Sequence, residues 1–327
     1  MSATAASAAE PVRRVRPAYV YSAAGFLLLV ALVLTLAGVG ERAGRLTDWQ
    51  ALVLGITQGF TELLPISSSG HLILVPLLAN WHYLENHPDF NKTFDVALHL
   101  GTLVSVVVYF WEDVVRYTGA WLTSVRRRSV TGEDQRIAWW IFAATIPTAL
   151  AGAVGESTIE DRLGQPYQIA ILLAVFGILL WVADRQPQER TIGQLGFWTA
   201  FAVGISQILA LVPGVSRSGI TITTGRFARL ERDTAARFAF LLLIPIVFGA
   251  VVFKGAKHVV FGTLPAGSIG PFLVGTLAAA AIGLIAIDLL LGFVRKHDYT
   301  IFVLYRLVAA AAIIAVIASG WRGAHFG

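Results

Sequence analysis

The sequence predicts an all-α polytopic membrane protein, built as an inverted-topology repeat with two re-entrant helical hairpins and an extra N-terminal transmembrane helix. Of its 327 residues, 56% are hydrophobic and 14% are charged, whereas a soluble domain averages roughly 25% charged residues. Several apolar runs reach the ~20 residues that cross a bilayer as a helix. Two further apolar segments are interrupted midway by proline, glycine and serine, which predicts broken helices.

About seven spans are predicted. The first, 18–40, follows Arg13, Arg14 and Arg16, and its apolar core exceeds the 7–15 residues of a signal peptide. It is therefore interpreted as a retained anchor, the alternative being a cleaved signal, and the Ala- and Ser-rich tail 1–17 before it is predicted to be disordered and cytoplasmic. The remaining spans are predicted at 93–112, 137–155, 167–183, 236–253, 269–292 and 299–320.

The two interrupted segments are predicted to be re-entrant hairpins at 48–79 and 196–225. "LPISSSG" and "VPGVSRSG" stand at their centres. Proline removes a backbone donor and disfavours helix at the preceding residue, so each segment becomes two half-helices joined by a turn. Such a hairpin enters and leaves a membrane on the same face, provided that protein covers its broken backbone.

The hairpins are related by an internal repeat. "GITQ" at 55–58 and "GISQ" at 204–207 lie 149 residues apart, and "ISSSG" at 66–70 and "VSRSG" at 215–219 have the same offset. Three predicted spans follow each hairpin, giving repeats at 48–183 and 196–320, and an odd number of spans inverts the second copy. Transporters use this construction to place a binding site at mid-membrane. A chance match in an Ala-, Gly- and Leu-rich chain is the alternative.

The distribution of basic residues predicts the orientation. With the N-terminus in the cytoplasm, sixteen of the 25 Lys and Arg residues fall in inside segments and seven in outside segments, while Arg217 and Arg306 lie within apolar segments. This bias follows the positive-inside rule and places the C-terminus outside. The basic pI near 9.7 is thereby explained without a nucleic-acid partner. The absence of cysteine excludes disulfides and thiolate metal sites.

The hairpin turns carry the residues that predict chemistry. Each turn leads into a helix that starts with serine and glycine, and free amides at a helix N-terminus attract anions. Arg217 lies in an apolar segment, where arginine usually faces a partner or ligand, and its planar fork suits phosphate. The alternative without a role in binding is an ion pair between Arg217 and Glu62 that only holds the hairpins together.

Residues before and after the first turn suggest a phosphotransfer site. Gln58 and Glu62 are four residues apart on one helix face and could supply oxygen ligands to Mg²⁺ or Ca²⁺, or Glu62 could act as a base. The serines 67–69 offer helix caps or a nucleophile, and His71 could move protons or attack phosphorus. Asp95 and His99, also four residues apart, are predicted to lie in a second shell; a packing hydrogen bond is the alternative.

Two stretches resemble the signature motifs of the undecaprenyl-diphosphatase family, the bacitracin-resistance membrane phosphatases. These are "QGFTELLPISSSGHLIL" (58–74) and "PGVSRSGITIT" (213–223), and "NKTFDVALHLGTLVSVVVYF" (91–110) resembles the first span of the family. The resemblance covers about 48–320, which leaves out the N-terminal helix. The family's acidic pair falls on Gln58 and Glu62. Since the first position holds glutamine here, catalytic weight shifts to Glu62.

The resemblance implies removal of the terminal phosphate from undecaprenyl diphosphate, at a site that needs a divalent cation and opens to the outer face of a bacterial plasma membrane. The monophosphate formed carries cell-wall precursors. The implied partners are the prenyl diphosphate and membrane lipid, and a homodimer is left open. The implied reacting groups are Glu62, Ser68, His71 and Arg217. The implied phosphate-binding residues are Ser67, Ser69, Gly70, Ser216, Ser218, Gly219 and Thr221.

Three alternatives for the attacking group remain at this point: Ser68, His71 or water. A lipid-phosphate flippase or anion transporter, using the same inverted repeat without hydrolysis, is the rival function, because fold alone does not fix function. Apart from the site, Asp288 and Arg306 lie several residues inside the inner ends of neighbouring predicted spans. They are predicted to form a structural ion pair.

Overall fold

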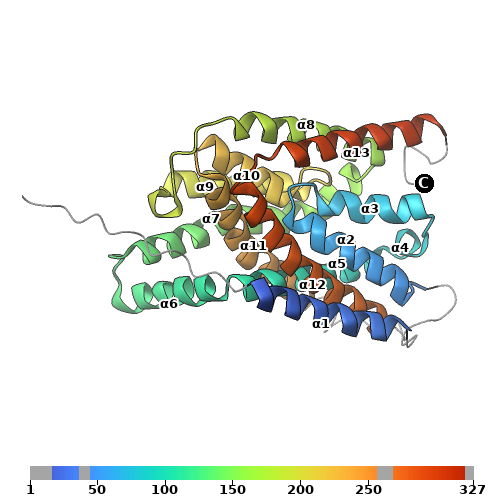
Figure 1. Cartoon of the computed structure of the whole chain (residues 1–327), viewed down its shortest axis with the longest axis horizontal. Helices are drawn as coiled ribbons and strands as arrows, with labels where there is room; N and C mark the ends of the chain where they lie inside the picture. The colour runs from blue at the N-terminus through green and yellow to red at the C-terminus, as the bar shows by residue number, and fades with distance from the viewer. Residues whose placement is uncertain (1–16, 37–44, 256–267, 321–327) are drawn as a thin grey trace, which may run out of the picture.

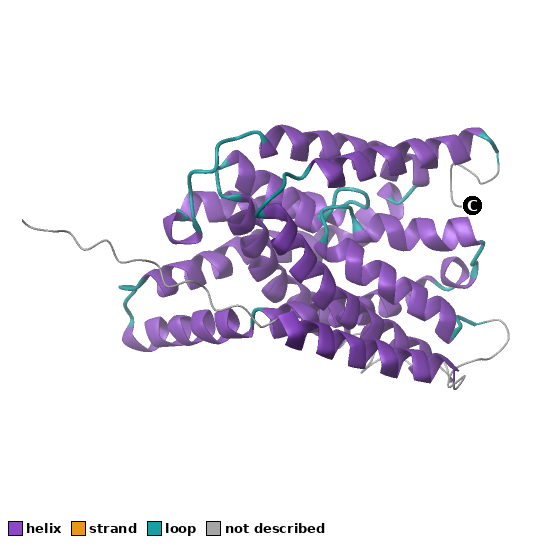
Figure 2. Cartoon of the chain, viewed as in Figure 1, coloured by secondary structure: helices purple, strands orange, loops and turns teal. Residues whose placement is uncertain are grey.

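The computed structural model describes residues 17–36, 45–255 and 268–320. The predicted tail 1–17, except Pro17, and the predicted end of the first span after Leu36 lie outside these residues. The described chain is helical, with one isolated β-bridge between Arg190 and Leu230 (Figure 2). The all-α fold class predicted from composition is confirmed.

Seven helices are long and apolar enough to cross a membrane in the described part of the chain. These are α1 (Pro17–Leu36), α5 (Pro88–Tyr109), α7 (Glu133–Leu163), α8 (Pro166–Asp184), α11 (Arg232–Gly255), α12 (Ile269–Val294) and α13 (Thr300–Ala318). They match the seven predicted spans, although α5 begins before residue 93 and α7 extends beyond both predicted ends. The sequence reasoning missed α6 (Trp111–Arg127), because a search for long apolar runs passes over an amphipathic helix with charged ends.

Both predicted hairpins are broken helices. The first consists of α2 (Asp48–Leu63) and α3 (Ser68–Ala79). The second consists of α9 (Phe197–Ser206), the 3₁₀ turn η2 (Gln207–Leu211) and α10 (Arg217–Phe227). Ser67 and Ser216 precede the second arms, and each has φ of 77°, a value that is uncommon for a residue other than glycine. Since these serines occupy equivalent positions of the two "SG"-ending motifs, the repeat seen in the sequence extends to an unusual backbone conformation.

The two hairpins enter the molecule from opposite ends. In Figure 1, α2 and α3 come from the end where α4 lies, whereas α9 and α10 come from the other end, and the turns meet in the middle. The Gly214 amide donates to Ser67 Oγ at 3.1 Å, and Ser218 Oγ donates to the Leu64 carbonyl at 3.0 Å. Opposed entry with joined tips is the arrangement expected of an inverted repeat.

Glycines let the repeats pack into each other. A Cβ on Gly55 in α2 would overlap the carbonyl of Gly275 in α12, and a Cβ on Gly204 in α9 would overlap the carbonyl of Ala144 in α7. Gly55 and Gly204 are the first residues of the matching "GITQ" and "GISQ" motifs. The first arm of each hairpin therefore lies against the second predicted span of the other repeat, at a separation that only glycine permits. Because each hairpin packs against a span of the other repeat, the two repeats hold both turns in one packed core.

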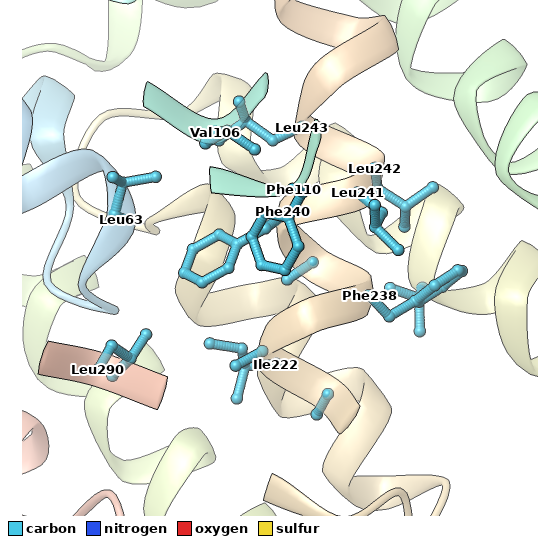
Figure 3. Packing of buried hydrophobic residues seen from close by; sticks show 14 of the residues in the cluster. Leu63, Val106, Phe110, Ile222, Phe238, Phe240, Leu241, Leu242, Leu243 and Leu290 are labelled. Carbon is cyan, nitrogen blue, oxygen red and sulfur yellow. The ribbon is translucent and has the colours of Figure 1, made fainter. Parts of the chain in front are cut away.

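The largest hydrophobic cluster supports the first hairpin next to its turn. Leu63, the last residue of α2, packs with residues of α5, α10, α11 and α12 (Figure 3). The labelled side chains in this view are Leu63, Val106, Phe110, Ile222, Phe238, Phe240, Leu241, Leu242, Leu243 and Leu290. Because Glu62 immediately precedes Leu63, the core holds the backbone that carries the candidate carboxylate.

Smaller helices complete the connections. They are α4 (Tyr83–Asn86) and the 3₁₀ turn η1 (Ile192–Gln194). The α1 helix packs along α12 through Val20 and Ala24, and the Tyr21 hydroxyl donates to Asp288 at 3.0 Å. Among the described residues, the extra helix is thus joined to the repeats by apolar packing and by the hydrogen bond from Tyr21 to Asp288.

Candidate active site at the hairpin junction

Glu62 lies at the centre of the junction. It is in the last turn of α2 and is 3% exposed. The Ser68 hydroxyl, at the first residue of α3, donates to Glu62 Oε2. Gln58 Nε2 lies 3.4 Å from the same oxygen, and His99 Nε2 from α5 lies 3.6 Å from it. The break in the helix thus folds Ser68 back onto a carboxylate six residues earlier. In this position Glu62 can accept the proton of the Ser68 hydroxyl, which increases the nucleophilicity of the serine oxygen.

Arg217 brings a positive charge from the other repeat. Its Nη1 lies 3.9 Å from Glu62 Oε1, so the contact on which the alternative reading of Arg217 depended is present. Neither of these two buried atoms has a hydrogen-bond partner within the described residues. Arg217 and Ser68 are each the first residue of a hairpin's second arm, so the repeats place a guanidinium and a hydroxyl at equivalent helix starts. At this distance Arg217 Nη1 makes no hydrogen bond to Glu62, so its N–H groups can donate to a bound anion.

His71 is directed away from Glu62. Its Nδ1 lies 2.6 Å from the Ser67 carbonyl, its Nε2 lies 2.7 Å from the hydroxyl of Tyr305, and the two rings stack. Both ring nitrogens are therefore engaged, which favours Ser68 over His71 as the attacking group. The imidazole next to the carboxylate is that of His99, whose Nδ1 lies 2.7 Å from the Asp95 carbonyl. His99 thus contacts Glu62 directly, closer than the predicted second shell.

Four of the other predicted phosphate-binding side chains make hydrogen bonds at the hairpin tips, and two of these bonds cross between the hairpins. Ser67 and Ser218 make the two contacts across the tips described above. Ser216 Oγ accepts from the Gly219 amide at 3.1 Å, and Thr221 Oγ1 donates to the Arg217 carbonyl at 2.8 Å. Ser67, Ser216 and Ser218 satisfy backbone groups at the breaks, which is required where water is absent, whereas Thr221 bonds to carbonyls of its own helix. In this structure the four hydroxyls are engaged by backbone, and their predicted contact with phosphate stays a prediction.

A cavity of about 480 Å³ adjoins the junction. Its lining includes the polar and charged residues Ser69, Asp95, His99 and Arg217. The rest of the lining is formed by Leu72, Ile73, Pro76, Leu77, Trp81, Leu84, Glu85, Pro88, Asn91, Lys92, Val96, Gly164, Gln165, Ala210, Leu211, Pro213, Val247, Ala250 and Val251. Leu84 and Glu85 belong to α4, which lies at the end of the molecule where α3 ends (Figure 1). A lining that combines charged groups with many apolar side chains suits a ligand with a charged head and an apolar tail.

The predicted ion pair between Asp288 and Arg306 is wrong. Asp288 accepts hydrogen bonds from the hydroxyls of Tyr21 and Tyr109, at 3.0 and 3.1 Å. All three nitrogens of the Arg306 guanidinium donate to backbone carbonyls, among them that of Pro65 at 3.2 Å. Opposite charges on neighbouring helices suggested a pair, but the broken backbone at the tips supplies acceptors that sequence periodicity does not reveal.

Sequence reasoning also passed over Gln207. It is 1% exposed, and neither polar atom of its side chain has a hydrogen-bond partner within the described residues. It is the counterpart of Gln58 in the second repeat, so the "GISQ" match contained the signal. Tyr305, by contrast, lies in an apolar run and gave no signal before its contact with His71 was seen.

The two histidines should differ in their effect on turnover. We expect His99→Gln to lower kcat by about 10- to 100-fold, because it removes the imidazole beside Glu62. We expect His71→Gln to change kcat by less than about fivefold, because an amide can retain one of its two hydrogen bonds. Steady-state kinetics of both purified variants measures the difference. A larger loss of kcat in His71→Gln than in His99→Gln would contradict the assignment.

Fold and site together define a polytopic membrane protein whose two opposed hairpins bring a buried carboxylate, a hydroxyl and a guanidinium together. The chain belongs to the family of bacitracin resistance protein BacA, whose model matches residues 51–312. It is 43% identical over 273 residues to the undecaprenyl-diphosphatase of Moorella thermoacetica, which covers 83% of this chain and 98% of the relative. It is 44% identical over 269 residues to that of Geobacter sulfurreducens, covering 82% and 97%. Helix α1 precedes the residues that the family model matches.

Proposed function

We propose that the chain is an integral membrane phosphatase that hydrolyses undecaprenyl diphosphate to undecaprenyl phosphate and inorganic phosphate. This reaction returns the lipid carrier of cell-wall synthesis to its monophosphate form. The observation that carries the proposal is the hydrogen bond from Ser68 to Glu62, opposite Arg217 and next to a cavity with apolar walls. The family membership and the names of the relatives give the substrate class.

In the proposed mechanism the diphosphate binds at the junction and its prenyl chain follows the apolar walls of the cavity. Ser68 Oγ attacks the terminal phosphorus while its proton passes to Glu62. The bond between that phosphorus and the bridging oxygen breaks, and undecaprenyl phosphate leaves with the bonding electron pair. Water then hydrolyses the phosphoserine and restores the serine. Arg217 supports both steps by neutralising charge on the transferred phosphoryl oxygens.

A divalent cation, Mg²⁺ or Ca²⁺, is part of the proposal. Gln58 Oε1 and Glu62 Oε1 are buried oxygens without a hydrogen-bond partner in the described structure. Two such oxygens fit a hard cation that is otherwise held by substrate phosphate and water, as is usual for Mg²⁺. When bound, the cation would neutralise charge on the diphosphate. Gln58 in place of a second carboxylate supplies an oxygen without a negative charge, which predicts weaker binding than at a two-carboxylate site.

Addition of a chelator should therefore stop turnover. We expect phosphate release by the purified protein to fall to background with excess EDTA and to return when Mg²⁺ or Ca²⁺ is added back. We also expect Gln58→Glu to lower the cation concentration that gives half-maximal activity, because it adds a negative charge to the ligand set. Full activity in EDTA after the protein has been stripped of metal would contradict this part of the proposal.

The proposed location is the bacterial plasma membrane, with the N-terminus in the cytoplasm and the C-terminus and cavity mouth outside. The excess of Lys and Arg in the predicted inside segments supports this orientation. The cavity lining includes residues of α4 and of the start of α5, which this orientation places on the outer side. In this orientation, substrate reaches the site from the outer leaflet.

The proposed function is tested by phosphate release from purified protein in detergent, with prenyl diphosphates of several chain lengths. The expected result is metal-dependent release of one phosphate per substrate molecule, together with the corresponding prenyl monophosphate. No release from any prenyl diphosphate, combined with substrate-driven anion or lipid movement in vesicles, would instead establish the transporter alternative.

A further inference from the structure

Arg306 has an unusual environment for a charged side chain. It lies in α13, is 0% exposed, and donates only to backbone carbonyls in the contacts that the structure shows. Nη1 donates to Pro65 at 3.2 Å, Nη2 donates to Gly214 and Val215 at 3.0 Å each, and Nε donates to Leu173 of α8 at 3.0 Å. One guanidinium thus joins the turns of both repeats to the α8–α13 pair.

The carbonyls that Arg306 contacts lie between the residues of the proposed active site. Pro65 is three residues after Glu62 and three before Ser68, and Val215 is two residues before Arg217. The short link 64–67 sets the separation of Glu62 from Ser68, and the link 212–216 sets the position of Arg217. We propose that Arg306 is a positioning residue, which holds the two links in register so that Glu62, Ser68 and Arg217 converge.

The surrounding backbone is adapted to this side chain. A Cβ on Gly219 in α10 would lie 2.9 Å from Arg306 Nη1, so one of the two would have to shift, whereas a Cβ on Gly177 in α8 would meet Arg306 Cβ at 3.4 Å, an ordinary van der Waals contact. Gly219, predicted to bind phosphate, therefore makes room for the guanidinium. A lysine cannot replace this geometry, because its single nitrogen cannot donate to both turns and to α8 with the fixed fork of arginine.

The neighbouring residue reinforces the same connection. Tyr305 contacts His71, which lies in the first turn of α3. Consecutive residues of α13 thus contact the second arm of the first hairpin and the links of both hairpins. Since broken backbone in a membrane is tolerated only where protein satisfies it, Arg306 supplies in one side chain the donors that both links require. A role limited to general stability would not require the acceptors to flank the reacting residues.

The experiment compares Arg306→Lys with Arg226→Lys. Arg226 is the matched control: it is also 0% exposed, donates to the Asp184 carboxylate and to backbone carbonyls, and lies at the far end of α10. The inference rests on the proposed phosphatase activity. We expect Arg306→Lys to lower kcat at least about 100-fold with KM changed less than about threefold. We expect Arg226→Lys to keep kcat within about threefold, even if its melting temperature falls equally.

A distance measurement tests the same inference without reference to activity. Because the chain has no cysteine, paired cysteines at the exposed positions Leu78 in α3 and Phe227 in α10 can carry spin labels. We expect the distance distribution between the labels to broaden in Arg306→Lys and to stay narrow in Arg226→Lys. If the wild-type chain proves inactive, this measurement still decides whether Arg306 holds the hairpins in register.

A milder variant covers the case in which Arg306→Lys does not fold. Gly219→Ala keeps the charge of Arg306 but places a methyl group 2.9 Å from Arg306 Nη1, and we expect it to lower kcat about fivefold and to broaden the same distribution. Equal kcat losses in Arg306→Lys and Arg226→Lys, or unchanged label distances in Arg306→Lys, would overturn the inference. Where Arg306→Lys cannot be purified, wild-type kcat and label distances in Gly219→Ala would overturn it.

Discussion

Replacing Ser68 with alanine is expected to lower kcat by at least about 1000-fold, because the variant retains the cavity and charges of the site but lacks the attacking oxygen. Ser68 is the hydroxyl that donates to Glu62 Oε2. The change removes one buried hydrogen bond, so the protein should remain folded, with a melting temperature within a few degrees of wild type. Phosphate release and thermal unfolding of the same preparation measure both quantities.

Ser69→Ala is the matched control for this variant. Ser69 has the same chemistry one residue later and lines the cavity, but no contact between it and Glu62 is seen in the described structure. We expect a severalfold increase in KM with kcat within about threefold, because the residue faces the ligand and not the base. A Ser68→Ala variant that keeps kcat within tenfold of wild type would remove Ser68 from the mechanism and leave direct attack by water.

Replacing Arg217 with alanine is expected to lower kcat/KM by about 1000-fold or more, through the loss of charge stabilisation on the transferred phosphoryl group. Its Nη1 lacks a hydrogen-bond partner in the described structure, although it lies 3.9 Å from Glu62 Oε1. Lysine at this position keeps the charge but loses the fork, so we expect Arg217→Lys to recover only part of the activity. Steady-state kinetics of both variants gives the comparison.

A suitable control is Arg237→Ala. Arg237 is an arginine of α11 that pairs with Asp233 on its own helix at 2.8 Å. It does not line the cavity, so we expect kcat/KM close to wild type. Activity of Arg217→Ala within a few-fold of wild type would show that the guanidinium serves only to pair with Glu62, which is the bland alternative suggested by the sequence.

Most of the fold could be predicted from the sequence, because a membrane-spanning helix is recognisable as an apolar run of about 20 residues. The repeat was accessible because the hairpin turns keep the same residue types at one offset, as in Ser67 and Ser216. Glu62 and Arg217 stood out because ionisable groups in apolar segments are costly and mark candidate functional sites, and Ser68 stood out as part of the serine run at the break between them. Helix α6 was missed because it is amphipathic, with charged residues in its first and last turns, and therefore contains no long apolar run.

The contacts within the site depend on long-range packing, and sequence spacing does not determine them. His71 and His99 were both visible as polar residues, but only the positions of α5 and α13 decide which of them contacts Glu62. Arg306 was assigned a carboxylate partner by analogy with ordinary ion pairs. Its actual partners are carbonyls exposed by the two helix breaks, and these exist only when both repeats have folded together.

In the proposed mechanism, Ser68 attacks the terminal phosphorus and Glu62 is its base. The most direct measurement is rapid-quench trapping with a prenyl diphosphate labelled with ³²P in the terminal phosphate, followed by mass-spectrometric mapping of the labelled peptide. We predict a transient phosphoserine at Ser68 that forms and decays within one turnover and is absent in Ser68→Ala. Label on His71, or full turnover with no protein-bound label at any quench time, would contradict the claim.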